Sequence, residues 1–229
     1  DRWKERDPNW KPAAYQKEQD PIRGVFAYVA DGLLQPGEEA PAHQPQLLPG
    51  QVKLKNINGD DKLNEEDMVL IGRNDPKFIF GFNNNFSYKN FDLNIYMYGQ
   101  VGKIAGANSY YDAWGSNGNR IKLGQNVPVS FKDAWSSDNQ KSTRPSFIES
   151  AYGTGDLFLQ KISFLRIRNI TLGYTVPISK SICNRLRVYA DVNNPCVWTN
   201  WKGQDPETDS NTNAYPNVTS FSIGVDISF

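Results

Sequence analysis

The stretch that decides the fold class runs from Phe78 to Tyr98 and reads FIFGFNNNFSYKNFDLNIYMY. Its first half carries aromatic residues mostly at even positions, and its second half carries apolar residues mostly at odd positions. Alternation with a period of two indicates a β-strand with one apolar and one polar face. Because only Lys89 and Asn90 separate the two halves, the sequence predicts a hairpin with a tight turn.

Three further stretches downstream show the same alternation. The first runs from about Phe158 to Val176, and its apolar residues move from odd to even positions near Arg168 and Asn169, which predicts a β-bulge there. The second has its apolar residues at even positions over 186–192, and the third has them at odd positions over 221–229. We therefore expect about five long strands joined by alternately short and long connections.

This rhythm of strands and connections is typical of transmembrane barrels, which have tight turns at one end and long loops at the other. Strands in soluble antiparallel sandwiches are usually shorter, about five or six residues. Upstream of the alternating region, prolines keep interrupting residues 1–50, where 24–29 is the one strand candidate.

Composition excludes several classes of function. The 25 Lys and Arg balance the 25 Asp and Glu, so no net charge favours nucleic acid as a partner. A single histidine, His43, leaves little for a histidine-based catalytic relay or zinc site. The high aromatic content, 13% of residues, fits both a soluble β-rich domain and an outer-membrane barrel.

A polar segment at 56–67 has the oxygen spacing of an EF-hand calcium loop. Asp61 stands where the loop needs Gly, and the last ligand position carries the shorter Asp67 in place of Glu. The spacing predicts weak Ca²⁺ binding, and a solvated turn without metal is the alternative. The candidate ligands are Asn56, Asn58, Asp60, Lys62 through its carbonyl, Asn64 and Asp67.

A long segment at 102–156 is rich in Gly, Asn and Ser and carries scattered aromatic residues. Loops of this length are uncommon in compact domains and are usually functional. We expect its aromatic side chains to contact a substrate or to form a lid, with packing between loops as the alternative. These side chains are Tyr110, Tyr111, Trp114 and Trp135.

Two other patterns favour structural interpretations. Asp205 and Glu207 form a carboxylate pair of the kind glycosidases use, but no orienting group accompanies them, so the sequence predicts a structural turn and no enzyme. Cys183 and Cys196 flank an extended stretch that is too long for a disulfide between them. We expect two free thiols.

Several segments, taken in order along nearly the whole chain, resemble the SusC/RagA family of TonB-dependent outer-membrane transporters, over the C-terminal part of that family. Each segment is short, and their shared order makes the resemblance specific. The segments are PIRGVFAYVADGL at 21–33, PGQVK at 49–53 with the acidic loop to Asp67, IGRNDPKF at 71–78, SYKNFDL at 87–93, SFLRIRNITLGY at 163–174, LRVY at 186–189, KGQDPE at 202–207 and the terminal aromatic strand.

The resemblance implies an all-β fold, in which the C-terminal antiparallel strands belong to a large barrel of the 22-stranded plugged type. Residues 1–76 would form an irregular extracellular region, and residues 77–229 would form barrel strands and loops. Five strands cannot close such a barrel in lipid, so the chain is expected to be a fragment. The resemblance also implies that Phe229 is the barrel-assembly signal.

The function implied is import of oligosaccharides or peptides across the bacterial outer membrane. The partners implied are the rest of the barrel and its plug, a SusD-like surface lipoprotein, TonB through the N-terminal part of the transporter, and outer-membrane lipid. No cofactor is required beyond the calcium that 56–67 could bind. The alternative function is that of a secreted, soluble β-sandwich module that binds glycans and carries the calcium loop.

Overall fold

A computed structural model shows two compact units. Residues 1–75, 104–160 and 209–212 belong to the first unit, and residues 76–103, 161–208 and 213–229 belong to the second. The structure describes residues 11–17, 20–106, 129–147, 151–178, 183–203, 205–208 and 215–229. No helix in these ranges is long and apolar enough to cross a membrane.

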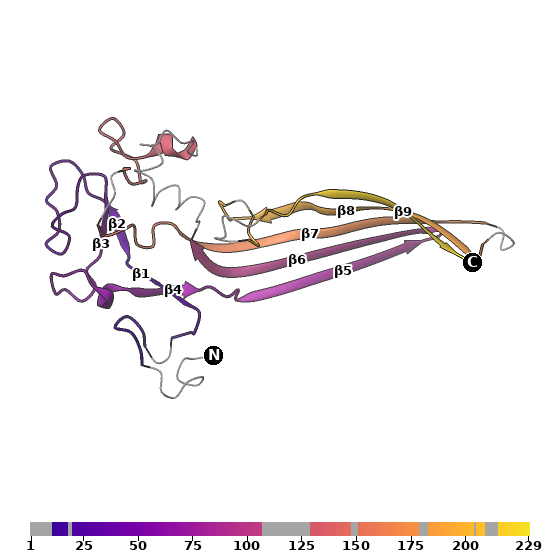
Figure 1. The fold of residues 1–229 in the computed structure, drawn as a ribbon, viewed down its shortest axis with the longest axis horizontal. Helices are drawn as coiled ribbons and strands as arrows, with labels where there is room; N and C mark the ends of the chain where they lie inside the picture. The colour runs from indigo at the N-terminus through magenta and orange to yellow at the C-terminus, as the bar shows by residue number, and fades with distance from the viewer. Residues whose placement is uncertain are drawn as a thin grey trace. The chain divides into compact units, whose positions relative to one another are not determined.

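A five-stranded antiparallel sheet makes up most of the second unit, and its strands lie side by side in chain order (Figure 1). The prediction of an all-β fold with about five long strands is therefore confirmed. The strands are β5 (Phe78–Tyr88), β6 (Phe91–Gly106), β7 (Leu159–Val176), β8 (Arg185–Thr199) and β9 (Ser220–Ser228).

The hairpin predicted from Phe78 to Tyr98 forms as expected. Tyr88 pairs with Phe91 across the two-residue turn, and the pairing continues without interruption to Phe78 and Val101. Lys89 has a positive φ of 52°, which is uncommon for a residue with a side chain and marks the sharp reversal of the chain.

The bulge predicted near Arg168 and Asn169 also forms. Ile167 pairs with Cys196, whereas Asn169 pairs with Asn193, so one residue of β7 faces two residues of β8. This irregularity keeps apolar side chains on one face of the sheet although their positions in β7 change from odd to even.

The first unit contains two small sheets that the prediction of an irregular N-terminal region missed. β1 (Gly24–Ala27) pairs with β4 (Val69–Arg73), and β2 (Ala30–Leu33) pairs with β3 (Val52–Leu54). Only β1 lies in the predicted strand candidate. Strands of three to five residues are too short to show a clear alternation of polar and apolar positions.

The core of the first unit forms around β2 and β3. Leu33, Val52 and Leu54 are buried together, and Trp135 and Tyr152 from the later part of the chain pack against them. Two short 3₁₀ turns complete the described secondary structure, η1 (Glu65–Asp67) and η2 (Val129–Asp133).

Candidate functional site

One face of the five-stranded sheet is apolar on every strand. The register places Phe82 beside Met97 and aligns Leu172, Ala190 and Ile223 across three strands. Many large apolar side chains of this face are exposed to solvent in the structure. They are Phe78, Phe82, Phe86, Tyr88, Phe91, Val101, Leu172, Val188, Trp198, Phe221, Ile223, Val225 and Ile227. Water-soluble monomers rarely expose such a continuous patch, so this face requires an apolar environment.

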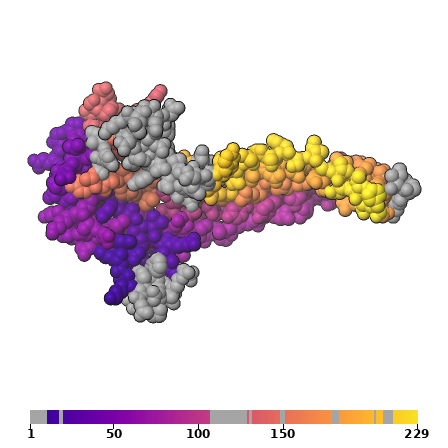
Figure 2. All heavy atoms as spheres, in the orientation of Figure 1, coloured from indigo at the N-terminus to yellow at the C-terminus, as the bar shows by residue number. Residues whose placement is uncertain are grey.

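Figure 2 shows β9, in yellow, along the surface of the sheet. Ile223 on this strand is 84% exposed, and its neighbour Ser222 belongs to the opposite face. A strand that alternates in this way suits a wall between lipid and water.

The opposite face is polar, and its side chains bond to one another across the strands. The Asn94 amide donates to Asn83 at 2.7 Å and to Asn85 at 2.6 Å, which links β6 to β5. The Asn169 amide donates to Asn193 at 3.0 Å, which links β7 to β8. This face can therefore line an aqueous interior while its polar groups remain paired.

Arg187 links three strands on this polar face. Its guanidinium donates to both carboxylate oxygens of Asp92, at 2.6 Å and 2.9 Å, and to Asp226 at 3.0 Å. The link passes over Gly173 of β7, where an added Cβ would lie 2.4 Å from the Arg187 guanidinium and 2.5 Å from the Asp92 carboxylate. Glycine at 173 leaves the space that the ion pair needs.

Asp205 and Glu207 are held by two arginines of β7. Arg166 donates to Asp205 at 2.8 Å and to Glu207 at 3.2 Å, and Arg168 donates to Glu207 at 2.8 Å. Burial alone would raise the pKa of Asp205, but backbone N–H bonds from Glu207 and Asn217, together with the charge of Arg166, hold that pKa below its ordinary value. A carboxylate held ionised is a poor general acid, and this arrangement supports the predicted structural turn.

The oxygen-rich loop at 56–67 is folded around its own hydrogen bonds. Asn56 accepts from the N–H of Gly59 at 2.5 Å, and Asp60 accepts from the N–H of Lys62 at 3.0 Å. The Asn64 side chain accepts from the N–H of Glu66 at 2.7 Å. Across the described residues, no three His, Cys, Asp or Glu side chains gather as a metal-binding group. Calcium binding by this loop stays a prediction.

Asp67 closes the same loop from a buried position. Its carboxylate accepts backbone N–H bonds from Ile57 at 2.7 Å, Asn64 at 3.0 Å and Asn58 at 3.4 Å. Burial alone would raise the pKa of Asp67, but these three bonds outweigh it and lower the pKa below its ordinary value. Asp67 therefore stabilises the loop as an anion through these backbone hydrogen bonds.

Trp135 is half-buried over the turn at Gly50. An added Cβ on Gly50 would lie 2.2 Å from the Trp135 ring, and the indole N–H points to Gln35 at 3.4 Å. Because Trp135 also packs on the core of the first unit, the described contacts support the packing alternative for this side chain. Tyr110, Tyr111 and Trp114 lie outside the described residues, so substrate contact stays a prediction for the set.

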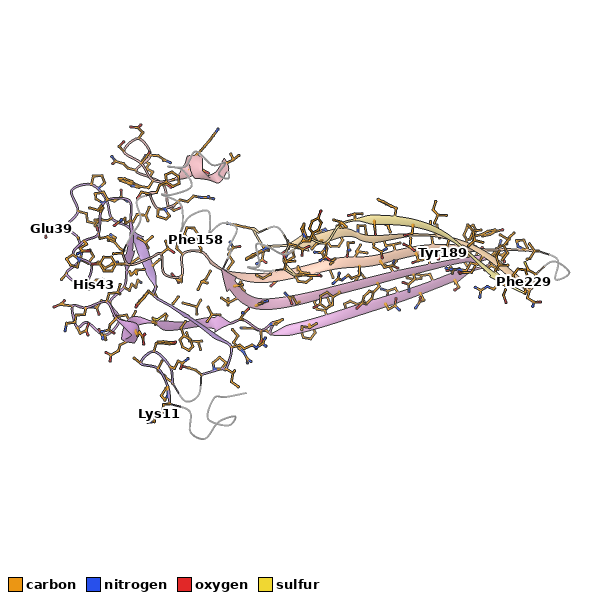
Figure 3. All side chains as sticks on the ribbon, viewed as in Figure 1. Lys11, Glu39, His43, Phe158, Tyr189 and Phe229 are labelled. Atoms are coloured by element: carbon orange, nitrogen blue, oxygen red, sulfur yellow. The ribbon has the colours of Figure 1, made fainter. Side chains whose placement is uncertain are left out.

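Phe229 follows the last residue of β9 (Figure 3). It is 88% exposed. Its role as an assembly signal stays a prediction. Both cysteines are free thiols, with Cys183 buried and Cys196 half-buried.

Sequence reasoning missed the ion pairs of the polar face. Arg166, Arg187 and Asp92 each lie within one of the short family segments, and none of these segments predicts an ion pair. Arg187 and Asp92 lie 95 residues apart, and Arg166 and Asp205 lie 39 apart. The one available signal was the presence of charged residues at polar positions of strands that were expected to line a barrel.

The fold and the two faces of the sheet define the class of protein. The chain is part of an outer-membrane β-barrel, and its five-stranded sheet belongs to the barrel wall. Comparison with known proteins agrees with this class. No protein-family model matches the chain. The chain is 27% identical to "TonB-dependent receptor P3" of Formosa agariphila over 93% of its own length and 23% of that protein. It is 27% identical to "TonB-dependent receptor SusC" of Bacteroides thetaiotaomicron, over 75% of the chain and 17% of that protein.

The fold is similar to that of a solved structure of the RagAB peptide transporter. The TM-score is 0.71 at 22% identity, over 90% of this chain and 22% of the transporter chain. The predicted resemblance to SusC/RagA-type TonB-dependent transporters is thus confirmed, and with it the predicted location in the bacterial outer membrane. The chain spans about a quarter or less of the length of the relatives it matches.

Proposed function

We propose that this chain forms part of the wall and external loops of a TonB-dependent transporter that imports oligosaccharides or peptides across the outer membrane. The observation that carries the proposal is the two-sided sheet. Its exposed apolar face suits lipid, and its hydrogen-bonded polar face suits the aqueous interior of a barrel. Similarity to proteins named as TonB-dependent receptors supports the coupling to TonB.

The other partners belong to the same proposal. The rest of the barrel would pair with β5 and β9, the two end strands of the sheet among the described residues, since unpaired strand edges are not tolerated in lipid. The plug, a SusD-like surface lipoprotein and TonB would act through other parts of the transporter. The similarity to a peptide transporter supports peptides as substrates, and the family resemblance keeps oligosaccharides as the other class.

No described feature favours an enzyme or a soluble sandwich. The carboxylate pair at Asp205 and Glu207 is neutralised by arginines, and the relatives are receptors and transporters. A sandwich would cover the apolar face with a second sheet, and no described residue of the second unit does so. The strands, of 9 to 18 residues, are also long for a sandwich.

Uptake by whole cells tests the proposal. Cells that lack the protein are compared with complemented cells, using labelled oligosaccharides and labelled oligopeptides as the probes. We expect loss of uptake for one of the two classes, and the same loss when a protonophore collapses the proton gradient in complemented cells. Uptake of a free amino acid and a monosaccharide serves as the control. Equal uptake of both probe classes with and without the protein would contradict the proposal.

A further inference from the structure

The connection between β8 and β9 is bound to the polar face of the sheet by a compact group of charged side chains and one amide. This group, which we call the 166/207 cluster, consists of Arg166, Arg168, Asp205, Glu207 and Asn217. Besides the three arginine bonds described above, the N–H of Asn217 donates to Asp205 at 3.1 Å, and the Asn217 amide donates to Glu207 at 2.8 Å. The cluster thus joins β7, residues 205–208 and the segment that leads into β9.

Burial and charge balance make the cluster rigid. The Arg166 and Asp205 side chains are 3% and 5% exposed, and Glu207 is 15% exposed. Two positive and two negative side chains cancel, and Asp205 accepts a further bond from the N–H of Glu207 at 2.9 Å. Loss of one partner from such a group would leave a buried charge unpaired, which is strongly unfavourable.

The cluster lies on the polar face of the sheet. Leu165 and Ile167 pair with Trp198 and Cys196 on the apolar face, so Arg166 between them points to the other side. The Arg168 guanidinium lies 5.9 Å from the centre of the Tyr98 ring, and Tyr98 shares its face of β6 with Asn94. Residues 205–208 therefore cover the face that would line the barrel interior.

We propose that residues 205–208 form a fixed constriction inside the barrel. These residues fold inward from the β8–β9 connection, are held by the 166/207 cluster, and limit the size of solute that passes through the barrel at this level. The inference rests on the proposed function, because only a closed barrel gives the polar face an interior. Long connections in such barrels lie at the extracellular end, so the constriction would precede the deeper part of β7 on the path inward.

The contacts of the cluster hold residues 205–208 in place, because each of its charges has a partner. Arg166 and Asp205 form a buried ion pair, and Glu207 pairs with both Arg166 and Arg168. The pKa of Asp205 is lowered by the same contacts, so mild acid does not neutralise it. These paired charges support a fixed element of the path.

Chemical access from outside the cell tests the proposal. In the full-length protein, with Cys183 and Cys196 replaced by Ser, a single cysteine is introduced by Thr171→Cys on the polar face beyond the cluster. Intact cells are treated with a small charged maleimide or with a maleimide linked to a long polymer. We expect the small reagent to label this cysteine and the polymer-linked reagent to label it slowly.

Releasing the segment is expected to admit the larger reagent. Arg166→Met removes one partner from each of the two carboxylates. Loss of a buried partner favours release of residues 205–208 from the sheet by at least about tenfold. Labelling by the polymer-linked maleimide should therefore rise on the order of tenfold or more. Arg185→Met is the matched control, since Arg185 is an exposed arginine on the same face and outside the cluster. It should change neither rate.

A second variant covers the case in which Arg166→Met does not fold. Replacing residues 205–208 by Gly-Ser-Gly-Ser removes both carboxylates and leaves the arginines open to water, and it should admit the polymer-linked reagent equally well. Unchanged polymer labelling in the released variants, or no labelling by the small reagent in any variant, would overturn the constriction. Equal labelling of Thr171→Cys by both reagents in the parent would also overturn the constriction. If the protein is absent from the outer-membrane fraction, the barrel proposal itself fails.

Discussion

Gly173 shows how a single residue position sets the inner wall of the sheet. The Arg187–Asp92 pair occupies the space over this glycine, and a Cβ would come within 2.4–2.5 Å of both side chains. Contacts that short force a shift of the ion pair or of the strand. The glycine is required by packing and not by backbone conformation.

We predict that Gly173→Ala destabilises the folded protein by about 1–3 kcal/mol, the usual cost of overpacking. Gly81→Ala is the matched control, because a Cβ at Gly81 of the same face would meet its nearest neighbour at an ordinary 3.6 Å. Heat-induced unfolding of the outer-membrane protein in detergent, followed by its shift in gel mobility, measures both variants. Equal stability of the two would contradict the role assigned to Gly173.

Asp67 gives a second prediction at the scale of one residue. Asp67→Asn replaces an anionic acceptor of three backbone N–H bonds, and the expected loss of stability in the 56–67 loop is about 1–3 kcal/mol. Asp61→Asn is the control, since Asp61 is exposed and has a positive φ of 59° that Asn tolerates. Hydrogen exchange at the Ile57 amide reports the opening of the loop.

The same substitution has a defined pH dependence. The folded pKa of Asp67 is lowered, so its contribution is fully present above the unfolded value of about 3.9 and is lost as the pH falls through the folded value. The difference in Ile57 exchange between the parent and Asp67→Asn should therefore be constant at neutral pH and shrink below about pH 4. A difference that grew in acid would show that the sign is wrong.

At the scale of elements, the structure of the 56–67 loop allows a prediction of how strongly it binds Ca²⁺. Its oxygens already accept bonds from the loop's own backbone, and Asp61 takes the place of the expected glycine, so we expect weak Ca²⁺ affinity, with a dissociation constant of roughly 10⁻⁴–10⁻³ M. Titration calorimetry with Ca²⁺ measures it, and Asp60→Asn should weaken it further. Absence of any saturable heat would show that the loop folds by its hydrogen bonds alone.

The long elements could be predicted from the sequence, and the short ones could not. The hairpin from Phe78 to Tyr98 and the bulge after Ile167 follow from the position of apolar residues in strands of 11 residues or more. β3 has only three residues, and its pairing with β2 depends on the core around Val52, which no local pattern reveals. Contact of Tyr110, Tyr111 and Trp114 with a substrate stays a prediction from the sequence alone.

The same limit applies to the candidate site. Sequence alternation predicts that the polar face exists, but it does not reveal which charges meet across four strands. Arg187 and Asp92 are brought together by the order of the strands, with the intervening β7 carrying a glycine at the crossing point. The 166/207 cluster likewise depends on where the β8–β9 connection returns to the sheet.

For the molecule as a whole, the central claim is that the five strands form a barrel wall with lipid on one side and water on the other. Both faces of the sheet support it, one by its exposed apolar side chains and the other by its internal hydrogen bonds. If the claim holds, neighbouring residues of one strand should respond oppositely to the same charged substitution.

Ile223 and Ser222 on β9 provide that measurement. Ile223→Lys should cost about 2–4 kcal/mol near the middle of the membrane and sharply reduce the folded, heat-modifiable protein in the outer-membrane fraction. Ser222→Lys, one residue away on the polar face, should assemble at close to the parent level. If both variants assembled equally, or if Ser222→Lys failed while Ile223→Lys assembled, the assignment of lipid and water to the two faces would be wrong.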